Sequence, residues 1–179
     1  MTIPRRLAGR YLKIELLGIS SSFDFVFDKL TFKTQTSVTN EAPALASTTD
    51  PLVRDIYKVG LNSLKECMQT VYEDGPKRDR RLWIGDLYLE ALANAHTFKN
   101  HELTKHCLYL LAAFANDEGL LHATLLEKPQ PNPQYGTHTL DYCLIYNVAL
   151  LEYLKETGDR ETANDLWPVV VRQIELAPV

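Results

Sequence analysis

The stretch of sequence that decides the fold is YEDGPKRDRRLWIGDLYLEAL, residues 72–92. Its apolar spacing predicts a helix over about residues 79–98 that is apolar around most of its circumference, and such a helix belongs in a protein interior. At 100° per residue, four polar or aromatic side chains share one face of this helix over three turns: Asp79, Trp83, Asp86 and Glu90. Buried carboxylates are costly unless they are paired or face a water-filled cavity. The stretch therefore poses a choice between a solvated face and an acid-lined cleft.

These acids have a purely structural interpretation and a functional one. In the first, Asp74 starts a turn with Gly75, and Asp79 caps the helix. Asp86 and Glu90 then form a solvated face that pairs with neighbouring basic side chains. In the second, one carboxyl donates a proton and the others bind hydroxyl groups beside an aromatic platform. That combination suits a carbohydrate, because sugars present many hydroxyls and apolar C–H faces. The residue pattern alone leaves both interpretations open.

Helical patterns continue on both sides of this stretch. Apolar spacing and end signals predict five helices, over about residues 51–71, 79–98, 101–115 and 139–157 and from 159 onward. Thr49 or Asp50 caps the first helix with Pro51 behind it, Gly158 stops the fourth, and Pro168 is expected to bend or split the fifth. Consecutive helices without intervening strands predict antiparallel αα-hairpins in an array or a closed ring, a mainly α fold. No fixed 34-residue period supports tetratricopeptide repeats.

The chain has a different character before residue 50. Residues 11–17 alternate between polar and apolar, phenylalanines occupy every second position of 23–27, and a third short run follows at 30–36. This period of two predicts half-buried strands, and three short strands cannot bury a core alone. We therefore expect residues 1–36 to be the trailing strands of a β domain and residues 37–50 to be a linker. The helical part then occupies 51–179.

Bulk composition excludes several classes of function. The net charge of −4 gives no general attraction to nucleic acid, and no apolar run approaches the length of a membrane span. We therefore predict neither a nucleic-acid partner nor a membrane partner. The first residues do not resemble a signal peptide, which leaves the compartment as cytoplasmic or undetermined.

Cysteine and histidine spacing argues against a metal or a cofactor. Cys67, Cys107 and Cys143 are odd in number and widely spaced, without a CxxC pair, so we expect small buried side chains on helices. The five histidines show no zinc-ligand spacing. We therefore predict no metal site and no cofactor.

The order of residues in the central stretch resembles a known family motif. The run DGPKRDRRLWIGD, residues 74–86, resembles the signature of the α-L-rhamnosidase family of inverting glycoside hydrolases, which belong to the six-hairpin glycosidases. Seven positions match over thirteen residues: Asp74, Pro76, Arg78, Asp79, Trp83, Gly85 and Asp86. The resemblance extends from about residue 11 to residue 179 and includes the TGD turn at 157–159. It implies a partial (α/α)6 barrel of αα-hairpins, preceded by a few β-strands from the edge of a β-sandwich.

The resemblance also implies roles for particular residues. Asp79 matches the catalytic proton donor, and Asp74 and Asp86 match acids that bind the hydroxyls of the sugar. Arg78 and Trp83 would shape the substrate site, whose ligand would be a rhamnoside-like glycan or glycoside. Crowding by the other acids and partial burial would raise the pKa of the donor, and the neighbouring arginines would oppose that shift.

The chain departs from the family pattern in two ways. The donor of the family is usually Glu, and Asp79 is one methylene shorter. An inverting hydrolase also needs a second carboxylate about 6.5–9.5 Å from the donor, and the family takes it from a later part of the barrel. Within 1–179 the default candidates are Glu90, Glu127 and Asp141. We therefore expect a fragment of a glycosidase that hydrolyses no rhamnoside by itself, and whose open barrel edges favour self-association.

A non-catalytic scaffold that binds a protein partner is the alternative to the glycosidase. Arrays of helical hairpins commonly bind protein partners, and a non-catalytic scaffold would be indifferent to changes at the acids. Most of the aromatic side chains fall at helical spacing and are expected in the core. Tyr135 and Tyr142, near the long loop between the third and fourth helices, are the two that we expect in a cleft.

Overall fold

A computed structural model of the chain describes residues 3, 6–18, 20–127, 130–133 and 137–177. The chain divides into two compact units, residues 1–35 and residues 36–179. Each unit is described by itself. Tyr135, one of the two predicted cleft tyrosines, lies outside the described residues.

The first unit differs from the sequence prediction. Its described residues contain neither helix nor strand, so the strands expected at 11–17, 23–27 and 30–36 are not formed there. The alternating phenylalanines are all largely exposed, from 53% for Phe25 to 73% for Phe23. The physical reason is the one that limits short strands in general. A few strands have no hydrophobic face to bury unless further strands or a helix cover it.

The first helix of the second unit has no buried residue. α1 (Pro51–Cys67) starts as predicted, because the Asp50 side chain accepts a hydrogen bond from the Leu52 N–H at 2.8 Å and Pro51 occupies the first turn. The helix ends earlier than the predicted Val71. The chain turns at Met68, which forms a short bridge with Tyr72, and both side chains are fully buried.

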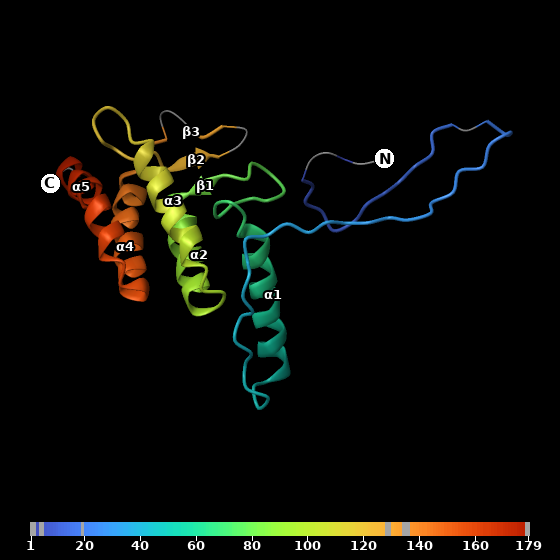
Figure 1. Ribbon diagram of the computed structural model, residues 1–179, viewed down its shortest axis with the longest axis horizontal. Helices are drawn as coiled ribbons and strands as arrows, with labels where there is room; N and C mark the ends of the chain where they lie inside the picture. The colour runs from blue at the N-terminus through green and yellow to red at the C-terminus, as the bar shows by residue number, and fades with distance from the viewer. Residues whose placement is uncertain (1–2, 4–5, 19, 128–129, 134–136, 178–179) are drawn as a thin grey trace. The chain divides into compact units, whose positions relative to one another are not determined.

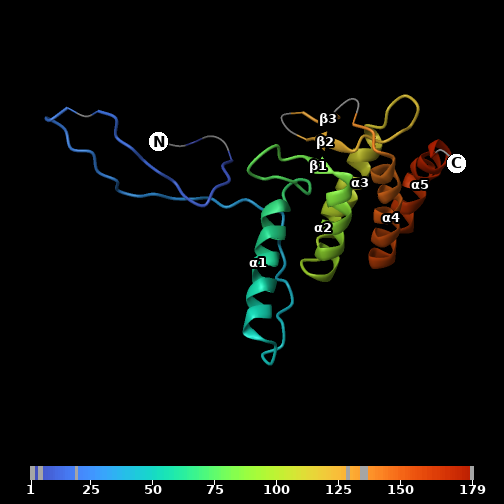
Figure 2. The same cartoon turned by 180° about the vertical axis from the view of Figure 1, so that it is seen from behind.

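The remaining four helices form the packed part of the unit. They are α2 (Ile84–His96), α3 (His101–Ala113), α4 (Leu140–Thr157) and α5 (Arg160–Leu176). α4 packs against α2 and α5, and α3 packs against α2, α4 and α5 (Figures 1 and 2). Gly158 ends α4 in the left-handed conformation, as predicted. Pro168 lies inside α5, which remains one helix. The mainly α fold of helical hairpins is confirmed.

A small antiparallel sheet joins the start of α2 to the long loop before α4. Its strands are β1 (Leu82–Trp83), β2 (Thr124–Leu126) and β3 (Asn132–Pro133), in the order β1-β2-β3. Leu82 pairs with Leu125, and Trp83 pairs with Thr124. The sheet lies at one end of α2 and α4 in both views (Figures 1 and 2).

The sheet explains why the prediction of a helix from residue 79 was wrong. The backbone of Leu82 and Trp83 is used in the pairing with β2, so α2 begins only at Ile84. Arg80, just before it, has a φ of 54°, which no α-helix accommodates. Asp79 and Trp83 therefore do not share a helical face with Asp86 and Glu90.

A buried polar network fixes the segment before this sheet to α2 and α3. Asn94 is fully buried and donates to the Tyr72 hydroxyl at 2.8 Å. The same hydroxyl lies 2.8 Å from Thr104 Oγ1 on α3. Asn94 also donates to the Asn100 carbonyl, and Asn100 caps α3. These bonds hold Tyr72 in place directly before residues 74–81.

Cysteines and apolar helices behave as ordinary parts of this fold. All three cysteines are free thiols on helices, with Cys107 and Cys143 buried and Cys67 half-buried. No helix in the described part of the chain combines the length and the hydropathy that crossing a membrane would require.

Candidate functional site

Residues 74–81 form a tight loop that leads into β1. The N–H of Asp74 donates to the Arg81 carbonyl at 2.8 Å, and the N–H of Arg78 donates to the Gly75 carbonyl at 2.7 Å. Gly75 has a φ of 62°, where a side chain is disfavoured. A Cβ at this position would also lie 2.7 Å from Asp79 Oδ1. Glycine is therefore required here, and its absent side chain makes room for the Asp79 carboxylate.

Two ion pairs arrange the charges of this loop. Arg78 Nη2 lies 3.0 Å from Asp74 Oδ2, and Arg81 Nε lies 3.6 Å from Asp79 Oδ2. The Asp79 side chain is 31% exposed and the Arg78 side chain 69% exposed. Asp79 Oδ1 is buried and has no hydrogen-bond partner in the described part of the chain. The predicted donor thus presents one paired and one unpaired oxygen, both at least partly withdrawn from water.

Two aromatic rings meet beside the loop. Trp83, the last residue of β1, makes an edge-to-face contact with Tyr142 on α4, with ring centroids 6.3 Å apart. A Cβ on Gly85 would lie 2.8 Å from the Tyr142 ring, so only glycine lets the ring approach α2 this closely. The tyrosine that sequence reasoning placed in a cleft therefore does contact the predicted platform residue Trp83.

Asp86 lies one residue beyond this contact, in the first turn of α2. Burial raises the pKa of Asp86, and the negative charge of Asp74 raises it further. Arg78 opposes the shift. The charge of Asp86 in turn contributes to a raised pKa at Tyr142, after burial of that ring. Asp74, Arg78, Asp86 and Tyr142 therefore lie close enough to influence one another.

Glu90 follows Asp86 one helical turn later. Burial raises its pKa to about 8, and the charges of Asp86, Asp74 and Glu73 act in the same direction. The Cys67 thiol of α1 hydrogen-bonds with the Glu90 carboxyl, which lowers the pKa only partly. Glu90 Oε2 is buried and has no hydrogen-bond partner among the described residues. Sequence spacing placed Glu90 near Asp86 correctly, but nothing in the sequence indicated the contact with Cys67.

The expected site residues therefore gather around the start of α2, by a different local structure from the predicted one. The loop carries Asp74, Arg78 and Asp79, the strand carries Trp83, and the helix carries Asp86. Burial and neighbouring carboxylates raise the pKa of Asp86 and Glu90, two acids on the same face of α2.

The default candidates for a general base differ in their surroundings. Glu90 is half-buried, and burial raises its pKa to about 8, which disfavours the ionised form that a base needs at neutral pH. Glu127 accepts a hydrogen bond from Thr70 Oγ1 at 2.5 Å. Asp141 is exposed in the first turn of α4, next to Tyr142.

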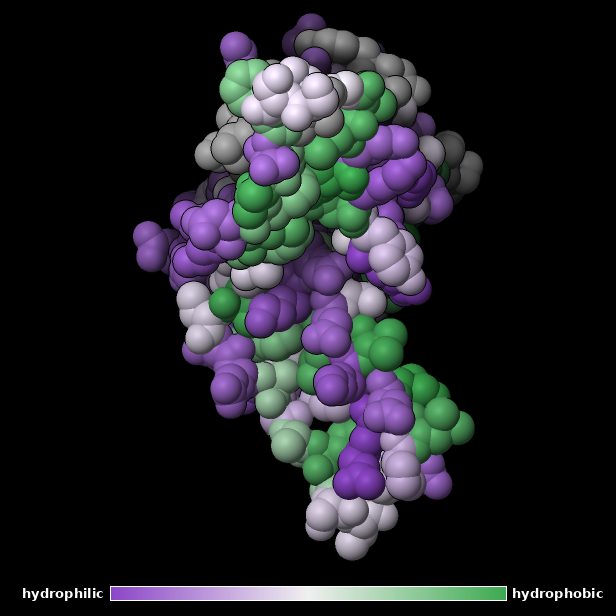
Figure 3. Space-filling model, turned by 90° about the vertical axis from the view of Figure 1, so that its right-hand side faces the viewer, coloured by the Kyte–Doolittle hydropathy of each residue, from purple (hydrophilic) through white to green (hydrophobic). Residues whose placement is uncertain are grey.

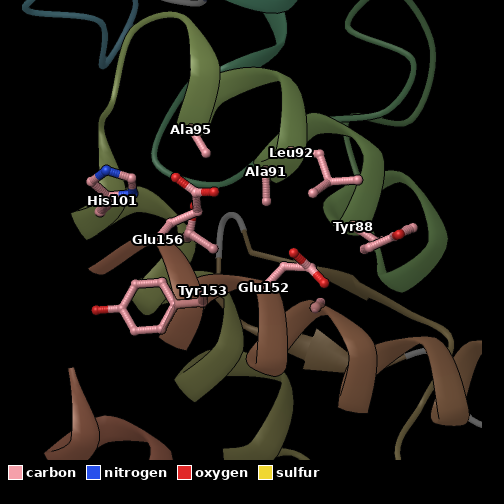
Figure 4. A pocket seen from close by; sticks show the side chains of 10 residues that line it. Tyr88, Ala91, Leu92, Ala95, His101, Glu152, Tyr153 and Glu156 are labelled. Carbon is pink, nitrogen blue, oxygen red and sulfur yellow. The ribbon is translucent and has the colours of Figure 1, made fainter. Parts of the chain in front are cut away.

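A shallow pocket lies elsewhere, between α2, α3 and α4. Alanines of α2 form one wall, and Glu152, Tyr153 and Glu156 of α4 form the other, with His101 at the edge (Figure 4). None of the residues that the family motif singles out lines it. Within the described residues, no three His, Cys, Asp or Glu side chains gather as a metal site would need.

Comparisons with known proteins agree with the fold and the motif. Residues 42–176 match the family described as bacterial alpha-L-rhamnosidase 6 hairpin glycosidase domain, and residues 1–34 match the glycosyl hydrolase family 78 alpha-rhamnosidase N-terminal domain. No curated protein matches the chain.

Two solved structures show the same fold. A rhamnosidase from Klebsiella oxytoca with rhamnose bound is 45% identical, with a TM-score of 0.75 over 79% of this chain and 27% of that one. A GH78 family rhamnosidase of Bacillus sp. GL1 is 23% identical, with a TM-score of 0.68 over 77% of this chain and 14% of that one. The chain thus spans about a quarter or less of the length of these structures.

The fold and the acid-lined loop define a six-hairpin glycosidase domain. More narrowly, the chain belongs to the bacterial α-L-rhamnosidase six-hairpin glycosidase family, because the match covers most of its length.

Proposed function

We propose that residues 74–86 form the acid side of a carbohydrate site that serves the hydrolysis of terminal α-L-rhamnosyl or related glycosidic bonds. One observation carries the proposal. Three buried side-chain polar atoms with neither a hydrogen-bond nor an ion-pair partner in the described part of the chain lie close together in sequence: Asp79 Oδ1, Trp83 Nε1 and Glu90 Oε2. Such atoms are costly and few in native proteins, and a bound ligand or a catalytic role is one explanation for them.

The proposed roles follow from charge and exposure. Asp79 donates a proton to the glycosidic oxygen as its bond to the anomeric carbon breaks. Asp74 and Asp86 accept hydrogen bonds from sugar hydroxyls. Arg78, paired with Asp74, orients that carboxylate and limits the negative charge of the site. The Trp83 ring packs against the apolar face of the sugar.

The proposed reaction inverts the configuration at the anomeric carbon. A water molecule attacks from the face opposite the leaving oxygen and gives its proton to a second carboxylate about 6.5–9.5 Å from the donor. The family takes this base from a later part of the barrel, so we assign it to sequence outside 1–179. Burial raises the pKa of Glu90 to about 8 and Glu127 is bonded to Thr70, which leaves the exposed Asp141 as the alternative within the chain. The polypeptide of 179 residues is therefore expected to bind sugar without turning it over.

Titration with L-rhamnose tests the binding part of the proposal. Trp83 is one of two tryptophans, so a Trp167→Phe background isolates its fluorescence. We expect rhamnose to change this signal, Asp86→Asn to weaken the affinity at least tenfold (about 1.4 kcal/mol) because hydroxyl acceptors are lost, and Asp79→Asn to weaken it less. A signal indifferent to rhamnose, or unaffected by Asp86→Asn, would refute the site.

Turnover of p-nitrophenyl α-L-rhamnoside tests the catalytic part. The purified polypeptide should release no p-nitrophenol. Release that disappears on Asp79→Asn would show that the base lies within 1–179 after all.

A second function, association of two copies, is favoured by the exposed face of α1. Four apolar side chains at helical spacing are about half to two-thirds exposed: Leu52, Val53, Ile56 and Val59. No α1 residue is buried. Hydrophobic side chains reach the surface in the lower part of Figure 3, at the level of α1 in Figure 1. We propose that a second copy covers this face, because exposed apolar stripes associate in water.

The mass in solution tests this association. Light scattering at increasing concentration should report a dimer or larger species, and Ile56→Asp should return it to the monomer. Lys58→Asp, on the same helix but on the exposed face opposite the apolar stripe, is the control. A monomer at all concentrations would refute the association.

A further inference from the structure

Glu90 lies beside the proposed sugar site but has none of the roles proposed above. It lies on α2 one turn after Asp86, so both side chains extend from the same face of the helix. The carboxylates of Asp74 and Asp79 pair with Arg78 and Arg81. Glu90 instead has a thiol, that of Cys67, as its hydrogen-bonding partner. Its second oxygen is buried without a partner in the described part of the chain.

The groups around Glu90 come from every element packed against it. α1 contributes Cys67, the segment before the loop contributes Glu73 and Asp74, and α2 itself contributes Asp86. The charge of Glu90 also raises the pKa of two further groups, Cys107 of α3 and Tyr72, which lies before the loop. The charges that act on Glu90 are all negative, and the other neighbours are thiols and a phenol. An ionised Glu90 would therefore be a buried anion among anions, which is strongly unfavourable.

We propose that Glu90 is a positioning residue of the sugar site: its carboxyl, anchored by Cys67 one helical turn behind Asp86, supports Asp74 and Asp86 from inside the protein. The proposal rests on the proposed function of these two acids as hydroxyl acceptors. In this arrangement a proton on Glu90 removes one charge from a cluster of four acids that would otherwise repel one another: Glu73, Asp74, Asp86 and Glu90. Asp74 and Asp86 then meet less repulsion where the sugar needs acceptors.

The proposal predicts a pH-dependent site. Burial raises the pKa of Glu90 to about 8, whereas burial raises the pKa of its partner Cys67 to about 12. If sugar binding requires the neutral carboxyl, the competent fraction falls about tenfold once the pH exceeds the pKa by one unit. Above pH 8 an ionised Glu90 repels Asp86, Asp74 and Glu73.

The test combines a direct titration with a binding curve. Carbon NMR of the Glu90 carboxyl should show a midpoint near pH 8, and Cys67→Ser should move it. In the Trp167→Phe background, the affinity for L-rhamnose should fall about tenfold from pH 7 to pH 9. In Glu90→Gln, a neutral group of the same shape, the affinity should match the parent at pH 7 and stay constant to pH 9. Glu66→Gln, on the surface of α1, is the matched control and should keep the loss at high pH.

The outcomes separate the inference from the proposed function. A carboxyl midpoint near the ordinary 4.5 overturns the inference whatever the sugar does. A midpoint near 8 with no rhamnose binding upholds the neutral carboxyl, overturns its positioning role and refutes the carbohydrate site. If Glu90→Gln loses affinity with pH as the parent does, the site survives and the positioning role is overturned. A merely structural role for Glu90 would change stability without removing the pH dependence of binding.

Discussion

Two groups of acids in the same helical unit have opposite surroundings. At the turn between α4 and α5, Asp159 accepts hydrogen bonds from Thr162 N at 3.0 Å, Thr162 Oγ1 at 2.7 Å and Tyr153 OH at 2.9 Å. Lys105 of α3 pairs with it at 3.1 Å. These bonds lower the pKa of Asp159 below its ordinary 3.8. Around the start of α2, by contrast, burial raises the pKa of Asp86 and Glu90.

The difference teaches how to separate a structural acid from a functional one. Asp159 caps α5 and ties it to two other helices, so each of its oxygens already has protein partners. The acids of the α2 group have too few partners, and Asp79 and Glu90 each keep a buried oxygen unpaired in the described part of the chain. A fold gains from the first arrangement, whereas the second costs stability and is retained where a ligand uses it.

The largest expected effect is an opposite pH dependence of stability from the two groups. Glu90 has a folded pKa of about 8 against an ordinary 4.5, so its contribution is fully present below pH 4.5 and is lost as the pH rises through 8. One proton gives a slope of about 1.4 kcal/mol per pH unit in the free energy of unfolding. Asp159, with its lowered pKa, contributes stability above pH 3.8 that is lost as the pH falls below it.

Urea unfolding at a series of pH values measures both windows. Glu90→Gln should flatten the slope between pH 4.5 and 8, and Asp159→Asn should flatten the slope below pH 3.8. If neither substitution affects its own window, the comparison between the two groups fails.

The next effect sharpens the aromatic part of the site. Gly85→Ala would place a Cβ 2.8 Å from the Tyr142 ring and push it away from Trp83. Overpacking of this kind costs about 1–3 kcal/mol, and the helix propensity of alanine returns about 1 kcal/mol, so we expect a net loss of about 1 kcal/mol. Rhamnose affinity should fall as well.

Gly60→Ala provides the matched control, because a Cβ at that position of α1 meets nothing within 4 Å. It should stabilise the protein by about 1 kcal/mol and leave rhamnose binding unchanged. Equal effects of the two alanines on binding would argue against a role for the Tyr142 contact.

Substitution of Asp159 is expected to have the smallest effect on rhamnose affinity. Asp159→Ala removes the cap of α5 and the partner of Lys105, so the melting temperature should fall. Rhamnose affinity at a temperature where the variant stays folded should equal that of the parent. A parallel loss of affinity would show that the two groups of acids are coupled through α4.

Much of the fold could be predicted from local sequence. Asp50 with Pro51 and Gly158 each marked a helix boundary that the structure has, because capping and the left-handed turn depend on a few adjacent residues. The apolar spacing of residues 101–115 and 139–157 likewise predicted α3 and α4 to within a few residues at each end.

The start of α2 could not be predicted in this way. Leu82 and Trp83 carry an apolar helical pattern, yet their backbone pairs with Thr124 and Leu125, about forty residues later in the chain. Such non-local hydrogen bonds leave no periodic signal in the stretch that they reshape. The error moved Asp79 and Trp83 off the helical face, although the same acids still gather around α2.

The sequence by itself determined that this chain is an array of helical hairpins, and the order of seven residues within 74–86 determined its family, since both depend on residue types at fixed local spacing. Only the tertiary structure decided which acids have a raised pKa and which keep an oxygen without a partner among the described residues. Cys67 lies 23 positions before Glu90, and Tyr142 lies 56 positions after Asp86. Burial and the sign of neighbouring charges depend on such contacts between distant segments, so they arise only when the chain is folded.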